Sequence, residues 1–248
     1  MPAPPDNLEP SNLALFLDVD GTLLDIEDHP AGVQADPGLV ALLAHLSARL
    51  DGALSLISGR PVADIDRIFA PARFAAAGAH GAEMRLHPDD PVSVTEWSLP
   101  TPILEEIRTF AAEDPGLLLE EKRGGVSLHY RRAPQLEKDC TEFVHRLLPE
   151  IETDFRLIAG KMVFEFAPKA HHKGAAISEM MQRDPFTGRR AVFVGDDVTD
   201  EDGFRTANAL RGITIRVGGN RDSEAEYSLP DVAAVRSWLE SIDRRLSH

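Results

Sequence analysis

The chain has 248 residues, 43% of them hydrophobic, which is enough for one globular core and a second small module. Its formal net charge of −15 argues against non-specific binding to nucleic acid or to anionic membranes, since both need a basic surface. A single cysteine, Cys140, excludes an intrachain disulfide.

The first predicted element is a buried strand that ends in acidic residues. An apolar run over residues 14–17 leads directly into Asp18 and Asp20, and Gly21-Thr22 follows. The strand therefore carries two carboxylates to its carboxyl end, before a turn that glycine permits. In open α/β sheets, ligands bind at that edge.

Strands and helices then alternate. Asp36-Pro37 is typical of a helix start, and leucines at helical spacing continue to Leu50. A second strand, 53–57, ends at Ser58, and Pro61 opens another helix. This alternation predicts a parallel sheet.

The pattern changes after about residue 82 and returns at His172. Between these points we expect strands and turns over 82–97, helices over 101–113 and 134–148, a hairpin of 117–121 with 126–130, and a hairpin of 155–158 with 162–166. Beyond His172 we expect helices over 173–182, 199–210 and 231–245, and strands over 191–194 and 213–217. The sequence thus predicts a doubly wound, mainly parallel α/β core, residues 1–84 and 169–248, and an inserted α+β cap, residues 85–168.

Four motifs resemble the haloacid dehalogenase superfamily of phosphohydrolases, in the order that superfamily requires. They are DVDGT at 18–22, LSLISGR with Ser58, HHKG with Lys173, and VGDDVTDE with Asp196, Asp197 and Asp200. Each acidic motif ends an apolar run. The resemblance implies the capped architecture of that superfamily, with the insert between the second and third motifs.

The core motifs suit phosphoester hydrolysis in two steps. Asp18 is the expected nucleophile, and Asp20 would protonate the leaving alkoxide and later accept a proton from water. Asp18 and Asp196, with the backbone carbonyl of Asp20, form an oxygen site suited to Mg²⁺. Ser58 and Lys173 would bind phosphoryl oxygens.

The remaining core positions have supporting roles. Gly21 and Thr22 would add backbone and hydroxyl donors for the phosphoryl group. Asp197 and Asp200 would orient Lys173 or a metal-bound water.

Taken singly, each motif also has a purely structural interpretation. Asp18 and Asp20 could form an Asx turn, Asp196-Asp197 could cap a helix, Ser58 could cap the Pro61 helix, and Lys173 could be a solvated helix lysine. Four such coincidences in the required order favour the catalytic interpretation.

The predicted cap carries a closer resemblance, to the trehalose-6-phosphate phosphatase family. It rests on FAAAGAHGAEMR, LEEKRGGVSLHYR, MVFEFAPKAHHKG and PFTGRRAVFVGDDVTDEDGF. The resemblance implies that Glu120, Lys122 and Glu165 bind the sugar of trehalose 6-phosphate. The sequence alone assigns no role to His80, Arg85, Arg131 or Lys161.

Alternatives stay open at this point. The core motifs would also be present in another sugar-phosphate phosphatase of the superfamily, one that acts on sucrose phosphate or a mannosyl phosphate. They would likewise be present in a phosphomutase or in a non-catalytic sugar-phosphate sensor.

The N-terminus lacks the features of a signal peptide, and no apolar stretch approaches the roughly 18 residues of a membrane span. We therefore expect a monomeric cytoplasmic protein that binds neither membrane nor nucleic acid.

Overall fold

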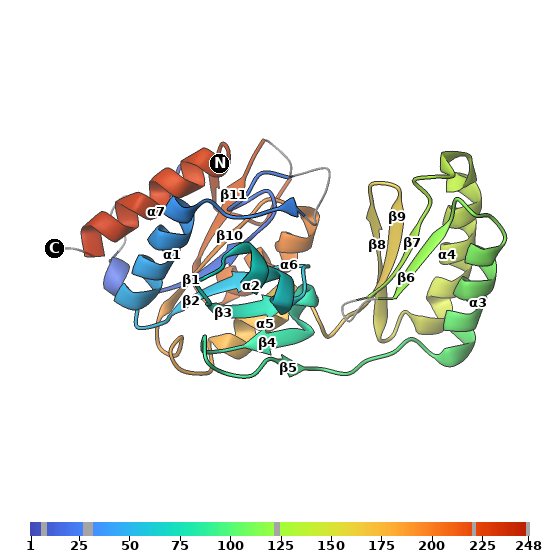
Figure 1. The fold of residues 1–248 in the computed structure, drawn as a ribbon, viewed down its shortest axis with the longest axis horizontal. Coiled ribbons are helices and arrows are strands. Elements are labelled where there is room, and N and C mark those ends of the chain that lie inside the picture. Colours follow the sequence, from blue (N-terminus) through green and yellow to red (C-terminus); the bar gives the residue numbers. More distant parts are fainter. Residues whose placement is uncertain (6–8, 27–31, 122–124, 220–221, 247–248) are drawn as a thin grey trace. The chain divides into compact units, whose positions relative to one another are not determined.

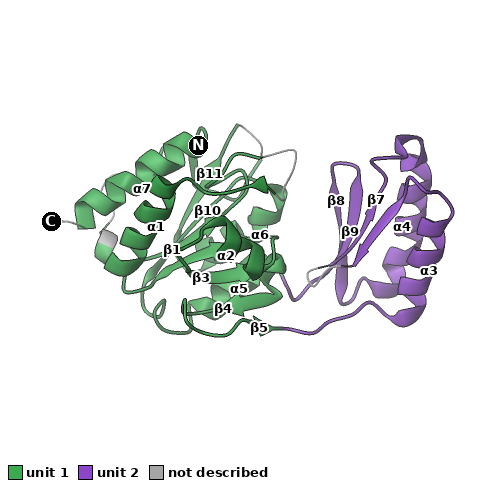
Figure 2. Ribbon diagram, in the orientation of Figure 1, with its two compact units in different colours: residues 1–94, 172–248 green, residues 95–171 purple. Residues whose placement is uncertain are grey.

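The computed structural model describes residues 1–5, 9–26, 32–121, 125–219 and 222–246. The chain divides into two compact units, shown in different colours in Figure 2. Unit 1 combines residues 1–94 and 172–248, and unit 2 consists of residues 95–171. Each unit has its own hydrophobic core. No helix in the described ranges is both long and apolar enough to cross a membrane.

Unit 1 is built on an eight-stranded sheet with the strand order β12-β11-β10-β1-β2-β3-β4-β5. Strands β12 to β3 run parallel, whereas β4 pairs antiparallel with β3 and β5. The prediction of a mainly parallel α/β core is confirmed. The strands are β1 (Leu13–Asp18), β2 (Leu54–Ile57), β3 (Ala75–Gly78), β4 (Glu83–Arg85), β5 (Ser93–Val94), β10 (Arg190–Gly195), β11 (Ile213–Val217) and β12 (Tyr227–Leu229).

Helices cover both faces of this sheet (Figure 1). They are α1 (Pro37–Arg49), α2 (Val62–Ile68), α5 (Lys173–Met180), α6 (Glu201–Ala209) and α7 (Val232–Leu246). Helix α1 packs against α7, and α5 packs against α6. Since α1 and α6 connect strands in opposite directions along the sheet, right-handed crossovers place them on opposite faces.

Strand β1 is the centre of unit 1. It lies between β10 and β2, and all six of its residues are buried. A continuous apolar run is what a parallel strand covered on both faces requires. Its position means that the carboxyl ends of β1, β2 and β10 lie side by side, so residues that follow these strands meet at one edge.

Unit 2 is a four-stranded antiparallel sheet with two helices on one face (Figure 1). Its strands are β6 (Leu118–Glu121), β7 (Val126–His129), β8 (Phe155–Gly160) and β9 (Val163–Pro168), in the order β6-β7-β9-β8, and its helices are α3 (Thr101–Ala112) and α4 (Glu137–Ile151). Both expected hairpins are present, as β6–β7 and β8–β9. Alternate residues of the sheet pack with α3 and α4, including Leu128, Phe164 and Phe166.

The boundary between the units differs from the one expected from sequence. Residues 85–94, which we expected in the cap, belong to unit 1, because β4 and β5 extend the core sheet by antiparallel pairing. Buried Arg85 helps to fix this edge. Its guanidinium donates to both carboxylate oxygens of Asp66, at 2.6 and 2.8 Å, and to the carbonyl of Phe74.

Candidate active site

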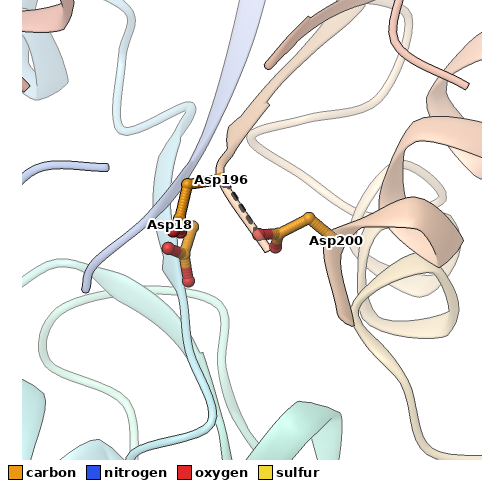
Figure 3. Close-up of side chains that lie close together, drawn as sticks. All are labelled: Asp18, Asp196 and Asp200. Atoms are coloured by element: carbon orange, nitrogen blue, oxygen red, sulfur yellow. Dashed lines mark hydrogen bonds between the residues drawn. The ribbon is translucent and has the colours of Figure 1, made fainter. Parts of the chain in front are cut away.

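The predicted acidic residues meet at the carboxyl edge of the core sheet. Asp18 is the last residue of β1 and pairs in register with Ile57, so Ser58 follows directly on the neighbouring strand. On the other side, Asp196 follows the last residue of β10. Carboxylate oxygens of Asp18, Asp196 and Asp200 lie within 4.8 Å of one another (Figure 3).

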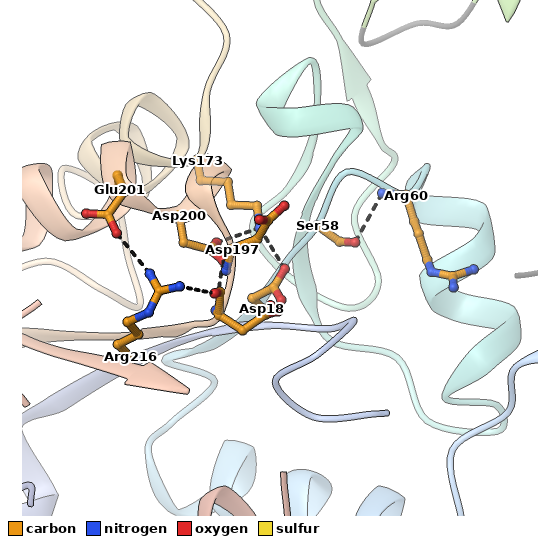
Figure 4. Close-up of polar contacts among 9 residues, drawn as sticks. Asp18, Ser58, Arg60, Lys173, Asp197, Asp200, Glu201 and Arg216 are labelled. Atoms are coloured by element: carbon orange, nitrogen blue, oxygen red, sulfur yellow. Dashed lines mark hydrogen bonds and ion pairs between the residues drawn. The ribbon is translucent and has the colours of Figure 1, made fainter. Parts of the chain in front are cut away.

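Lys173 joins two of these carboxylates. Its Nζ donates to Asp18 Oδ1 at 2.7 Å and to Asp200 Oδ1 at 2.5 Å (Figure 4). All three side chains are buried, and Lys173 is only 3% exposed, so it is not a solvated helix lysine. Burial alone would lower the pKa of Lys173, but the two carboxylates outweigh burial and hold that pKa above its usual value. Lys173 is therefore a fixed cation beside Asp18.

Both carboxylate oxygens of Asp200 accept hydrogen bonds. Its Oδ1 accepts from Lys173, and its Oδ2 accepts from the backbone N–H groups of Asp196 and Asp197, at 3.0 and 2.9 Å. A side chain at Gly195 would overlap the Asp200 carboxylate, so glycine is needed there. Asp200 thus contacts both Lys173 and the backbone of the turn that carries Asp196.

Asp196 has a different environment. Its Oδ1 is buried and finds no hydrogen-bond partner among the described residues. Burial raises the pKa of Asp196 to about 6, and the neighbouring Asp200 carboxylate adds to the effect. A buried carboxylate oxygen without a donor, close to a second carboxylate, is a donor set that fits a hard divalent cation. The residues present are therefore compatible with the divalent metal expected from sequence.

Arg60, which the sequence analysis did not single out, contacts Asp20. Its Nε donates to Asp20 Oδ2 at 2.6 Å, and its Nη2 donates to Oδ1 at 2.7 Å. Both carboxylate oxygens of Asp20 therefore accept from one guanidinium, which is a geometrically specific, bidentate contact. The backbone N–H of Arg60 also donates to Ser58 Oγ at 3.1 Å. One residue therefore links two of the predicted catalytic side chains.

The turn after β1 has a geometry that requires its glycine. Gly21 has a φ of +81°, and a side chain there would overlap the Asp196 carboxylate. Thr22 is buried, and its Oγ1 has no hydrogen-bond partner in the parts of the chain described. This buried hydroxyl lies in the turn that follows β1.

Two of the predicted sugar-binding residues share one face of the unit 2 sheet. Glu120 pairs in register with Ser127, which pairs with Glu165 on β9. This row is opposite the face that packs on α3 and α4, because neighbouring residues of these strands belong to the unit 2 core. Glu120 Oε2 lies 3.0 Å from Nε2 of His129. Lys122 lies outside the described residues.

A comparison of sequences assigns a family to this arrangement. A model of the trehalose-phosphatase family matches residues 16–233. The chain belongs to the trehalose-phosphatase family.

Individual relatives agree. This chain is 41% identical over 233 residues to a Sinorhizobium fredii protein named "Probable trehalose-phosphate phosphatase". The match covers 93% of this chain and 88% of the relative. The chain is 39% identical over 234 residues to trehalose-6-phosphate phosphatase of Escherichia coli K12, covering 94% and 87%. The C-terminal domain of C. albicans trehalose-6-phosphate phosphatase has the same fold, with a TM-score of 0.76 at 22% identity, covering 99% and 98% of the two chains.

Membership of the trehalose-phosphatase family identifies the chain as a phosphatase. Sequence reasoning about this family member missed Arg60 and Arg216. Arg60 offered the weaker signal, since its pairing with Asp20 connects two loops far apart in the chain. Arg216 offered a clear one, because an arginine inside the apolar strand 213–217 must have buried partners.

Proposed function

We propose that this phosphatase hydrolyses trehalose 6-phosphate to trehalose and phosphate, through an aspartyl-phosphate on Asp18. The buried Asp18–Lys173–Asp200 arrangement beside Asp196 carries this proposal, in a chain of the trehalose-phosphatase family. Asp18 attacks phosphorus, and the sugar oxygen leaves as its bond to phosphorus breaks. Water then attacks the phosphoryl group and releases phosphate from Asp18.

We propose Mg²⁺ as the metal, bound by Asp18, Asp196 and the backbone carbonyl of Asp20. When bound, the ion would withdraw negative charge from the phosphoryl oxygens and reduce their repulsion of the Asp18 carboxylate. The unpartnered Oδ1 of Asp196 supports this ligand set. Asp200 is proposed as an orienting residue, because its oxygens accept three hydrogen bonds, one from Lys173 and two from the backbone of Asp196 and Asp197.

The other polar groups at this edge would bind and position the phosphoryl group. Lys173 supplies a fixed positive charge, Ser58 would supply a hydroxyl directly after β2, and Thr22 would supply one from the turn that follows β1. Lys173 is held in place by Asp18 and Asp200 before substrate arrives, and such a fixed donor is effective at stabilising charge that develops during the reaction.

Asp20 is the proposed proton donor to the leaving sugar oxygen and the acceptor of a proton from the attacking water. Both of its oxygens accept hydrogen bonds from Arg60, so a proton can be carried on Asp20 only when this bidentate pair opens. We propose that Asp20 and Arg60 are paired in the resting enzyme and separate when substrate is bound.

Unit 2 is the proposed source of sugar specificity. Glu120 and Glu165 flank Ser127 on one sheet face, which places two carboxylates on a single surface where they could bind sugar hydroxyls. Lys122 is proposed to join them on the ground of the family resemblance. We propose that unit 2 acts as a cap on a monomeric enzyme, and light scattering would test the monomer.

The direct test is phosphate release from trehalose 6-phosphate, with Mg²⁺ and with chelator, beside sucrose 6-phosphate and glucose 6-phosphate. The Asp18→Asn variant is the matched control. We expect selective release that depends on Mg²⁺ and is lost in the variant.

Other results would redirect the proposal. Metal-dependent release from a different sugar phosphate would retain the core chemistry and reject the cap assignment. Binding of trehalose 6-phosphate without release would indicate a sensor. A requirement for a bisphosphate activator, with no free phosphate formed, would indicate a mutase.

A further inference from the structure

We infer that Arg216 is a positioning residue for the metal ligand Asp196. Arg216 lies on β11, next to β10, and pairs in register with Gly195, the residue before Asp196. It is 4% exposed, although it carries a charge. Its Nη2 donates to the backbone carbonyl of Asp196 at 2.7 Å. This inference rests on the metal site described under the proposed function.

The position of Arg216 is itself fixed from the other side. Its Nη1 donates to Glu201 Oε1 at 3.1 Å, and Glu201 Oε2 accepts from the backbone N–H of Glu224 at 2.8 Å. Glu201 is the first residue of α6. The guanidinium is therefore held between a helix start and the Asp196 peptide group, which leaves it little freedom to move.

The Asp196 turn is thereby held at two points. Asp200 accepts from the peptide N–H groups of Asp196 and Asp197, and Arg216 donates to the carbonyl of Asp196. Together these bonds fix the peptide groups on both sides of the Asp196 α-carbon. The Asp196 side chain starts from that fixed backbone, and no hydrogen bond within the described ranges holds its Oδ1.

Three possible roles of Arg216 predict three different changes in Mg²⁺ affinity. If Arg216 positions Asp196, replacing it weakens Mg²⁺ binding, and loss of an orienting group behind a metal ligand typically weakens binding by about 10- to 100-fold. If Arg216 acts only through its charge, replacing it strengthens Mg²⁺ binding, because a cation near the site is removed and Glu201 is left unpaired. If Arg216 only stabilises the fold, Mg²⁺ affinity is unchanged.

The chain offers a matched control for the loss of a buried arginine. Arg85 is also buried, and it also donates to one carboxylate and one backbone carbonyl, but on β4 at the other side of the sheet. Arg216→Met and Arg85→Met should both reduce folding stability. Only Arg216→Met should change the response to Mg²⁺. Arg216→Lys keeps the positive charge and one donating nitrogen in place of the guanidinium. This variant should bind Mg²⁺ better than the methionine variant.

The measurement is the rise in melting temperature during titration with Mg²⁺ alone, without substrate, followed by the Mg²⁺ dependence of phosphate release. For Arg216→Met we expect the half-saturating Mg²⁺ concentration to rise about 10-fold or more in both assays. Most of kcat should return at saturating Mg²⁺. If Arg216→Met does not fold, Arg216→Lys and Glu201→Gln carry the test, each with a smaller rise expected.

The outcomes separate this inference from the proposed function. No Mg²⁺ response in the unmodified protein would reject the proposed metal site itself. A normal response there, together with unchanged or tighter Mg²⁺ binding in the Arg216 variants, would reject the positioning role alone. An equal loss of Mg²⁺ affinity in Arg85→Met would also reject it.

Discussion

Replacing Asp196 with asparagine should stabilise the metal-free protein while removing its response to metal. Burial and Asp200 raise the pKa of Asp196 from the ordinary 3.8 to about 6. At pH 7 the ionised carboxylate therefore destabilises the folded state, by about 3 kcal/mol if the whole difference in pKa is counted. Asp196 is only half-buried, and solvent screens part of the effect. We expect Asp196→Asn to gain about 1–2 kcal/mol in chelator.

The dependence on pH gives this prediction its sign. A raised carboxyl pKa means that protonation of Asp196 favours the folded protein. This contribution to stability is complete below pH 3.8 or so, and it is lost as the pH rises through about 6. The advantage of Asp196→Asn should therefore be largest at pH 7 and above. It should fall to about half at pH 5, where the wild-type carboxyl group is mostly protonated in the folded state.

The assay is urea unfolding in chelator at pH 7 and pH 5, followed by tryptophan fluorescence. The chain has two tryptophans, Trp97 in unit 2 and Trp238 in α7. A Trp97→Phe background would leave Trp238 to report unit 1 alone. If Asp196→Asn is no more stable than its parent at pH 7, the electrostatic reasoning is wrong. If Mg²⁺ still stabilises the variant, Asp196 is not a metal ligand.

Three further predictions follow from the same contacts. Lys173→Met should lower the free energy of unfolding in urea by about 3–5 kcal/mol, because the buried carboxylates of Asp18 and Asp200 lose their cation. Unchanged stability would mean that these two carboxyl groups are neutral. Gly21→Ala should weaken Mg²⁺-dependent stabilisation more than Gly188→Ala, since both have positive φ but only the former would overlap a carboxylate; equal effects would reduce the cause to backbone strain. Arg60→Met should raise the ratio of trehalose 6-phosphate turnover to p-nitrophenyl phosphate turnover, because the pair that must open before Asp20 donates its proton is gone and the aryl leaving group needs no proton from Asp20; an unchanged ratio would contradict a role of Arg60 through that acid.

Local signals were sufficient for much of the fold and for the central side chains of the site. Asp18, Ser58 and Asp196 each follow an apolar run, and such runs form the buried parallel strands of an α/β sheet. Because the carboxyl ends of adjacent parallel strands lie together, the order of motifs already implied one cluster. The hairpins of unit 2 were also readable, since turn residues separate their strands.

The features that escaped prediction depend on tertiary contacts. Strand β3 is built from Ala75, Ala76 and Ala77, which favour helix when considered alone and become a strand through parallel pairing with β2. The partners of Arg60 and Arg216 come from distant parts of the chain. No periodicity in a single sequence specifies such pairs.

The interrupted order of the core strands has a consequence for synthesis of the protein. Unit 2 is one continuous segment with its own hydrophobic core, so it can fold as soon as residue 171 has left the ribosome. Strand β1 emerges first but needs β10, which emerges after unit 2 is complete. Until then the edge of β1 that will pair with β10 stays open, and an open apolar strand edge favours aggregation. The nascent chain should therefore depend most on chaperones between the synthesis of β1 and that of β10.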